Sequence, residues 1–133
     1  MMRERGASDV LSSRSFALWF GVLGPPLAWG AHLVLGDLIF ELGCAPGIGP
    51  KILGLPLETW AIIETVAAAA VIAAAGVMAL GAWRRLSTIS DGTRWNRAHA
   101  MAIAGIASSA IYLLLVVFGF VAPLFLRTCS TSL

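Results

Sequence analysis

The sequence predicts an all-α integral membrane protein that crosses a lipid bilayer three times. Hydrophobic residues make up 59% of the 133 residues and charged residues only 12%, a balance that lies far from that of a soluble domain. Three apolar stretches each exceed the roughly 20 residues that a helix needs to cross the hydrocarbon core. They lack the two-residue alternation of barrel strands, so only helices can satisfy their backbone amides inside lipid.

The three stretches define a single domain with short connections. The expected helices cover residues 16–43, 58–83 and 98–126. The expected connections are a polar tail over 1–14, an irregular loop over 44–57, a basic loop over 84–97 and a tail over 127–133. Gly24, Pro25 and Pro26 predict a kink in the first helix. The second helix is dominated by alanine and glycine, which let membrane helices pack closely.

The basic residues are distributed unevenly, and this distribution predicts the orientation. Seven of the nine lysines and arginines precede the first helix or lie in 84–97, whereas Lys51 and Arg127 lie on the opposite side. By the positive-inside rule, the N-terminus and the 84–97 loop are cytoplasmic, and the 44–57 loop and the C-terminus are periplasmic. We therefore expect a multi-pass protein of the bacterial inner (cytoplasmic) membrane. A net charge of only +2 gives no basis for binding nucleic acid.

The basic N-terminus also allows a second interpretation. Residues 1–14, followed by the apolar run Phe16–Leu23, resemble a signal peptide. The apolar run continues beyond Pro26, however, and cleavage would leave a remnant too short to span the membrane. We therefore favour a first transmembrane helix.

Five residues in and beside the second connection have the character of membrane-interface anchors. Arginine and tryptophan suit the headgroup level, and the residues in question are Arg84, Arg85, Arg94, Trp95 and Arg97. The alternative is a dedicated site for anionic lipid. We favour simple anchoring.

The two cysteines, Cys44 and Cys129, follow the first and third helices. Both are placed in the periplasm by an argument that uses only lysine and arginine. That compartment is oxidising, and two thiols at similar depth on adjacent helix ends are good disulfide candidates. We therefore predict a Cys44–Cys129 disulfide; the alternative is two unrelated interfacial thiols.

Two carboxyl side chains fall inside the expected membrane spans, where ionisable groups are costly and often functional. Asp37 and Glu64 each lie about 9 Å below the outer end of a helix, at about 1.5 Å per residue. Glu41 follows Asp37 by one helical turn, so an acidic patch is expected between the first two helices. The patch is either a proton or cation site, or a set of carboxyls that bond a partner subunit or reach the interface. We favour the second interpretation.

The two histidines are expected at different depths. His32 lies near mid-membrane and His99 near the inner end of the third helix, about 20 Å apart in depth. They therefore cannot ligate one haem iron between them. We expect His32 to form an interhelical hydrogen bond, with metal or haem ligation as the alternative, and His99 to be interfacial.

No motif of a soluble enzyme is present. The sequence contains no P-loop, no dinucleotide-binding glycine motif and no zinc-ligand spacing. We therefore expect a non-catalytic protein that carries no metal or cofactor of its own.

Parts of the first and third helices resemble a known group of proteins. The matching features are the stretch Trp19–Trp29 (WFGVLGPPLAW), Cys44 at the end of that helix, and the closing Pro123–Leu126 (PLFL) with Cys129. The group consists of uncharacterised small three-span bacterial membrane proteins whose genes often lie beside those of cytochrome c oxidase subunits. The second helix contributes little to this resemblance.

The resemblance implies an accessory subunit of a respiratory electron-transport complex, associated with a haem-copper cytochrome c oxidase or a supercomplex. Haem and copper would then belong to larger membrane subunits, and no catalytic residue is implied for this chain. The expected partners are those subunits and membrane lipids. Two alternatives remain open: an oxidase assembly factor, and a small oligomeric proton or cation transporter or channel.

Overall fold

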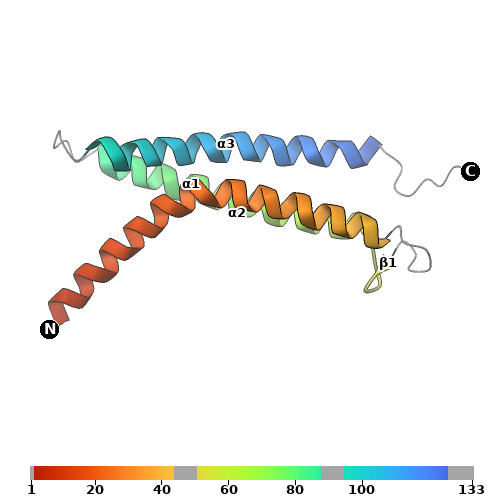
Figure 1. Ribbon diagram of the computed structural model, residues 1–133, viewed down its shortest axis with the longest axis horizontal. Coiled ribbons are helices and arrows are strands. Elements are labelled where there is room, and N and C mark those ends of the chain that lie inside the picture. The colour runs from red at the N-terminus through yellow and green to blue at the C-terminus, as the bar shows by residue number, and fades with distance from the viewer. Residues whose placement is uncertain (1, 44–50, 88–94, 126–133) are drawn as a thin grey trace, which may run out of the picture.

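A computed structural model of the chain contains three long α-helices and one small β-hairpin (Figure 1). It describes residues 2–43, 51–87 and 95–125. The elements are α1 over Met2–Gly43, β1 over Lys51–Ile52, β2 over Leu55–Pro56, α2 over Leu57–Ser87 and α3 over Trp95–Phe125.

All three helices are long and apolar enough to cross a membrane, as the sequence predicts. The candidate spans are Ser15–Gly43, Leu57–Ser87 and Arg97–Val121. Every helix contacts both of the others, so the three form one bundle. We call the end of the bundle that carries β1 and β2 the hairpin end. The opposite end, where α2 finishes and α3 begins, is called the arginine end.

Helix α1 begins much earlier than expected. Residues 2–14 were expected to form a polar tail, but they continue the helix from Met2. The segment contains no proline, so nothing in it prevents a helix. Its polar residues limit the membrane span, but the helix itself continues through them. Figure 1 shows a bend in α1 between this N-terminal part and the part that runs beside α2. Pro25 and Pro26 lie inside the helix, where each removes one backbone hydrogen bond.

The two connections are also more ordered than expected. Helix α2 extends to Ser87 and α3 begins at Trp95, so helix replaces both edges of the expected 84–97 loop. Part of the expected irregular 44–57 loop is an antiparallel hairpin, in which Lys51 pairs with Pro56 and Ile52 with Leu55. Apolarity locates the membrane part of a chain, and it does not mark where the backbone changes conformation.

The hairpin turns through Leu53 and Gly54, which both have positive φ angles of 52° and 80°. Two consecutive positive φ angles are the requirement of a type I′ turn, the common two-residue hairpin turn. Glycine adopts this backbone freely, whereas leucine is strained in it. The indole Nε1 of Trp60 donates a hydrogen bond of 2.9 Å to the carbonyl of Ile52, which ties the hairpin to α2.

All three helices pack closely toward the arginine end, where Gly21, Ala79 and Gly105 meet; we call these three residues the glycine seam. A Cβ added to Gly21 would lie 3.1 Å from the Ala79 Cβ, and one added to Gly105 would lie 3.0 Å from the same atom. The Gly105 position also approaches the backbone of Gly21, at 3.1 Å. All three helices therefore touch here with almost no side chain between them, as small residues permit in membranes.

Most apolar side chains point outward. Only 17%, 17% and 22% of the most apolar windows of the three spans are buried within the bundle. The buried apolar core is a narrow line that includes Ile72, Ala75 and Ala79 on α2 and Ala102 and Val116 on α3. The outward apolar surface is suited to lipid or to other membrane helices.

Candidate functional site

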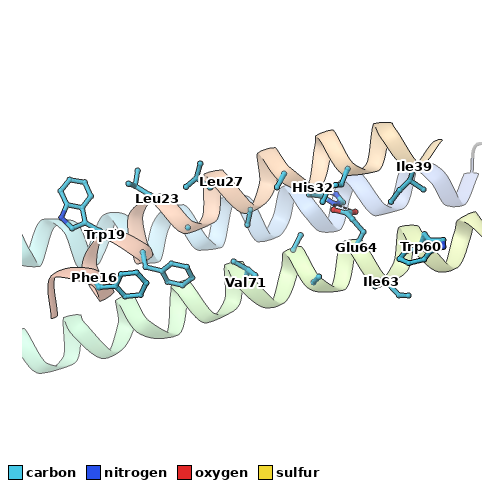
Figure 2. Close-up of a pocket in the computed structure, with 17 residues that line it drawn as sticks. Phe16, Trp19, Leu23, Leu27, His32, Ile39, Trp60, Ile63, Glu64 and Val71 are labelled. Carbon is cyan, nitrogen blue, oxygen red and sulfur yellow. Dashed lines mark hydrogen bonds and ion pairs between the residues drawn. The ribbon is translucent and has the colours of Figure 1, made fainter. Parts of the chain in front are cut away.

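An ionisable pair joins α1 to α2 inside the membrane spans. The Nδ1 of His32 lies 2.6 Å from Oε2 and 2.7 Å from Oε1 of Glu64. Only 12% of the His32 side chain and 11% of the Glu64 side chain are exposed. Figure 2 shows the two side chains pointing toward each other between the helices. This is the interhelical hydrogen bond that the sequence predicts for His32, with a partner that was not foreseen.

The pair satisfies two groups that would each be costly in lipid if alone. The hydrogen bond forms between imidazolium and carboxylate, and it forms equally between neutral imidazole and a protonated carboxyl. In both of these arrangements the summed charge of the pair is zero, whereas a neutral imidazole that donates from Nδ1 to a carboxylate leaves one negative charge. In the two neutral arrangements the contact needs no counter-ion from elsewhere at low dielectric.

Helix α3 closes the third side of the pair with backbone. A Cβ added to Gly119 would lie 3.8 Å from Nε2 of His32, an ordinary van der Waals distance, so α3 approaches the imidazole ring at this position. Both hydrogen bonds of the His32 ring involve Nδ1. Within the described part of the chain, no side chain or backbone group bonds Nε2.

The acidic patch expected from Asp37, Glu41 and Glu64 is not assembled. Asp37 and Glu41 are exposed, whereas Glu64 is partly buried against His32. Helix geometry explains the difference. Asp37 follows His32 by five residues and Glu41 follows it by nine, so their side chains point about 140° and about 180° around the helix axis from that of His32. Asp37 and Glu41 thus lie on faces of α1 that point away from Glu64.

The prediction that Asp37 and Glu64 lie at the same depth is also wrong. His32 comes eleven residues before the end of α1 at Gly43, and Glu64 comes seven residues after the start of α2 at Leu57. Since the two side chains are in contact, α1 extends about four residues, or about 6 Å, further than α2 at the hairpin end. Counting from helix ends assumes that the ends are level.

An open groove follows α1 and α2, and the ionisable pair forms part of its wall (Figure 2). Its volume is about 890 Å³, and every lining residue belongs to α1 or α2. Along α1 the lining runs from Phe16 to Ile39, which corresponds to about 35 Å of helix. His32 and Glu64 are the only ionisable residues among those that line it. Along α2 the lining runs only from Trp60 to Val71, about 16 Å of helix, so both helices wall the groove over about half of its length. The groove is apolar, and the His32–Glu64 pair is its one ionisable position.

A second polar contact lies near the arginine end. Trp83 Nε1 donates a hydrogen bond of 3.1 Å to Nε2 of His99. His99 lies near the start of α3, and only 8% of it is exposed, because it packs against α2 with its ring tilted against Trp83. Its expected place at the membrane interface stays a prediction. The two histidines thus have separate surroundings. The only sequence signal for this contact was the placement of Trp83 and His99 near the same membrane surface.

The expected anchors occupy the arginine end. Arg84, Arg85 and Arg97 are exposed there, the first two in the last turn of α2. Trp95 is the first residue of α3, and Arg94 lies outside the described residues. No further contact is needed to account for these side chains as anchors.

Cys44 and Cys129 lie outside the described residues, so their disulfide stays a prediction. The helices that precede them, α1 and α3, end on the same side of the bundle (Figure 1). We expect the intact mass of the unreduced chain to be two hydrogens lower than that of the reduced chain. Alkylation of both thiols in native membranes would contradict the pairing.

The described residues show no candidate metal site, and comparison with known proteins finds no match. The described residues contain no cluster of three or more His, Cys, Asp or Glu side chains that could hold a metal ion. No model of a known protein family matches the chain, and searches of curated proteins and of solved structures found no match either. The functional interpretation therefore depends on the site itself and on the sequence resemblance.

Proposed function

We propose that the protein is a non-catalytic accessory subunit of a larger respiratory membrane complex. The observation that carries this proposal is the groove beside α1 and α2, which follows α1 for about 35 Å and α2 for about 16 Å. A groove of this length leaves much of α1 and α2 without helix neighbours, and a larger membrane subunit would supply them. The polar position in its wall gives such a subunit a specific point of attachment.

The sequence resemblance indicates which complex is involved. The stretch Trp19–Trp29 resembles small bacterial proteins whose genes accompany those of cytochrome c oxidase. We therefore assign the chain to a haem-copper oxidase or a supercomplex that contains one. Haem and copper would be held by the partner subunits.

The proposed orientation places the arginine end in the cytoplasm and the hairpin end in the periplasm. The exposed Arg84, Arg85 and Arg97 would then face the anionic lipids of the cytoplasmic leaflet. Labelling of cysteines introduced at Ser87 and Leu53 in intact cells tests this. A reagent that cannot cross the membrane should react at position 53 and fail to react at position 87, and the reverse pattern would contradict the orientation.

Purification of the tagged full-length chain from its native membranes in a gentle detergent tests the function. Mass spectrometry should find oxidase subunits in near-stoichiometric amounts, and the finished enzyme should contain the chain. Association with immature subunits only would identify an assembly factor instead. An absence of oxidase subunits beyond the level seen with an unrelated tagged three-span protein would contradict both.

The His32–Glu64 pair also favours a second candidate, a small proton or cation transporter. Ionisable residues within transmembrane segments frequently mark ion pathways. This candidate predicts that the purified chain, reconstituted in liposomes, carries a proton or cation flux that Glu64→Gln abolishes. Flux no greater than that of empty liposomes would remove it.

A further inference from the structure

We propose that the groove between α1 and α2 binds a single transmembrane helix of the partner subunit, and that this helix donates a hydrogen bond to the His32–Glu64 pair. The inference rests on the proposed function, since it names the partner's contact at the same site. Beyond the proposed function, it names what occupies the groove, which surface of this chain makes the contact, and what kind of side chain the occupant places against the pair.

The length of the groove favours a helix over a phospholipid. The lining covers about 35 Å of α1 and about 16 Å of α2. The hydrocarbon core is about 30 Å thick and each lipid chain occupies half of it, so one lipid chain would leave half of the α1 wall uncovered. The ionisable pair lies toward the hairpin end of the groove, about 10 Å along α1 from Ile39 and about 6 Å along α2 from Trp60. A phospholipid in this groove would place acyl chain against the pair, and an acyl chain has no hydrogen-bond donor. A helix crosses the whole core and can place a polar side chain at any depth.

The lining residues also favour close approach by a helix. Gly24 and Ala68 are buried at the floor of the groove, and Ala28, Ala31 and Ala67 line it alongside them. Small residues at an interface let two helix backbones come near each other, which is the main source of attraction between helices in lipid. Larger residues on both sides, including Leu27 and Val71, would pack around the occupant.

The polar chemistry of the pair specifies the contacting side chain. Glu64 bonds only Nδ1 of His32 among the described residues, and a carboxyl group can accept several hydrogen bonds. A charged partner side chain is costly to place in lipid, whereas a neutral donor can bond the remaining lone pairs of Glu64 in every protonation state of the pair. The complementary group is therefore a neutral donor such as Ser, Thr, Asn, Gln or Tyr.

A second copy of this chain fits the groove less well. Most homodimers are two-fold symmetric, and such symmetry brings the same surface of each chain together. Two copies meeting at this surface would place groove against groove, which leaves both unfilled. A helix from a different subunit presents a convex surface and fills the groove.

Filling the groove with a bulky side chain tests the proposal. Ala31→Trp and Ala67→Trp replace exposed alanines that line the groove, and Ala74→Trp and Ala110→Trp replace exposed alanines outside it. A bulky side chain in the interface should reduce the co-purified partner about tenfold in the first two variants, equivalent to about 1.4 kcal/mol. The two control variants should retain it to within about twofold, and all four should elute with the wild-type profile in detergent.

Photo-crosslinking in native membranes identifies the occupant. A photoreactive residue at Leu27 or Val71, on the groove, should crosslink to an apolar membrane-spanning peptide of another protein that contains a neutral hydrogen-bond donor. The same residue at Leu114, exposed on α3, serves as the control and should not crosslink to that peptide. Crosslinks from the groove to this chain's own peptides, or to lipid only, would overturn the proposal.

The two experiments separate this inference from the proposed function. If the wild-type chain and both groove variants co-purify equally with oxidase subunits, the function stands and the groove contact is wrong. If no oxidase subunit co-purifies but the groove crosslinks to a span of another identified protein, the groove contact stands and the assignment to the oxidase is wrong.

Discussion

Two places where the helices of this bundle meet are held by opposite means. At the glycine seam, Gly21, Ala79 and Gly105 bring three backbones so close that a Cβ added to either glycine would lie 3.0–3.1 Å from the Ala79 Cβ. At the ionisable pair, His32 and Glu64 join α1 and α2 through a polar contact beside an open groove. The first region is closed and packed, and the second is polar and accessible.

The difference shows how stability and recognition can be separated in a small membrane protein. Lipid tails are as apolar as leucine, so helices associate in the membrane through close packing and hydrogen bonds. The glycine seam uses close packing and leaves no surface for a partner. The ionisable pair keeps hydrogen-bonding capacity on a groove, which makes it the more suitable of the two for binding.

The largest expected effect comes from Gly21→Leu in the glycine seam. The first added carbon already falls 3.1 Å from the Ala79 Cβ, so the helices must separate, at a cost of about 3 kcal/mol. Gly30→Leu is the matched control on the same helix, because nothing lies within 4 Å of its Cβ position. Reversible unfolding in mixed micelles measures both, and equal stabilities would show that the seam is not closed.

A double-mutant cycle on the ionisable pair tests the second region. His32→Leu and Glu64→Leu should each destabilise the bundle by about 1–2 kcal/mol, since each leaves one polar group without its partner in lipid. The double variant should recover part of the loss, giving a coupling energy of about 1 kcal/mol. Its bundle should remain folded while partner binding is lost. Strictly additive losses would indicate that the two side chains do not interact.

Much of the fold could be predicted from sequence, because apolar length fixes the number and position of spans. The partner of His32 could not. Counting residues from the expected helix ends predicts that Glu64 lies at the same depth as Asp37. The sequence does not show that α1 extends further than α2, and it does not show which face of α1 meets α2. The groove depends on how bulky side chains surround small ones after packing, and residue spacing alone does not contain that information.

The Trp83–His99 hydrogen bond lies at the arginine end, toward which the glycine seam also lies. It therefore tests whether that end of the bundle is stabilised by close packing alone or also by a polar contact. Trp83→Phe keeps an aromatic ring beside His99 and removes the indole donor to its Nε2. We expect a loss of about 1 kcal/mol, the usual net contribution of one buried hydrogen bond. Trp29→Phe is a fitting control, since Trp29 contacts the Tyr112 ring and no hydrogen bond of its indole is seen among the described residues. Equal losses in both variants would attribute the effect to ring size.

The smallest expected effect concerns the hairpin, where the strained Leu53 has an exposed side chain. Leu53 is 87% exposed at a φ of 52°, so its side chain contributes no packing within the chain that would offset the strain. Leu53→Asn should stabilise the hairpin by about 0.5–1 kcal/mol, because asparagine tolerates this backbone region better than leucine. Hydrogen exchange at Ile52 and Leu55 measures the change, and Leu55→Asn is the control at a position with ordinary strand geometry. If Leu53→Asn weakens partner binding without changing exchange, the leucine is kept for contact outside the chain, and recognition extends from the groove to the hairpin.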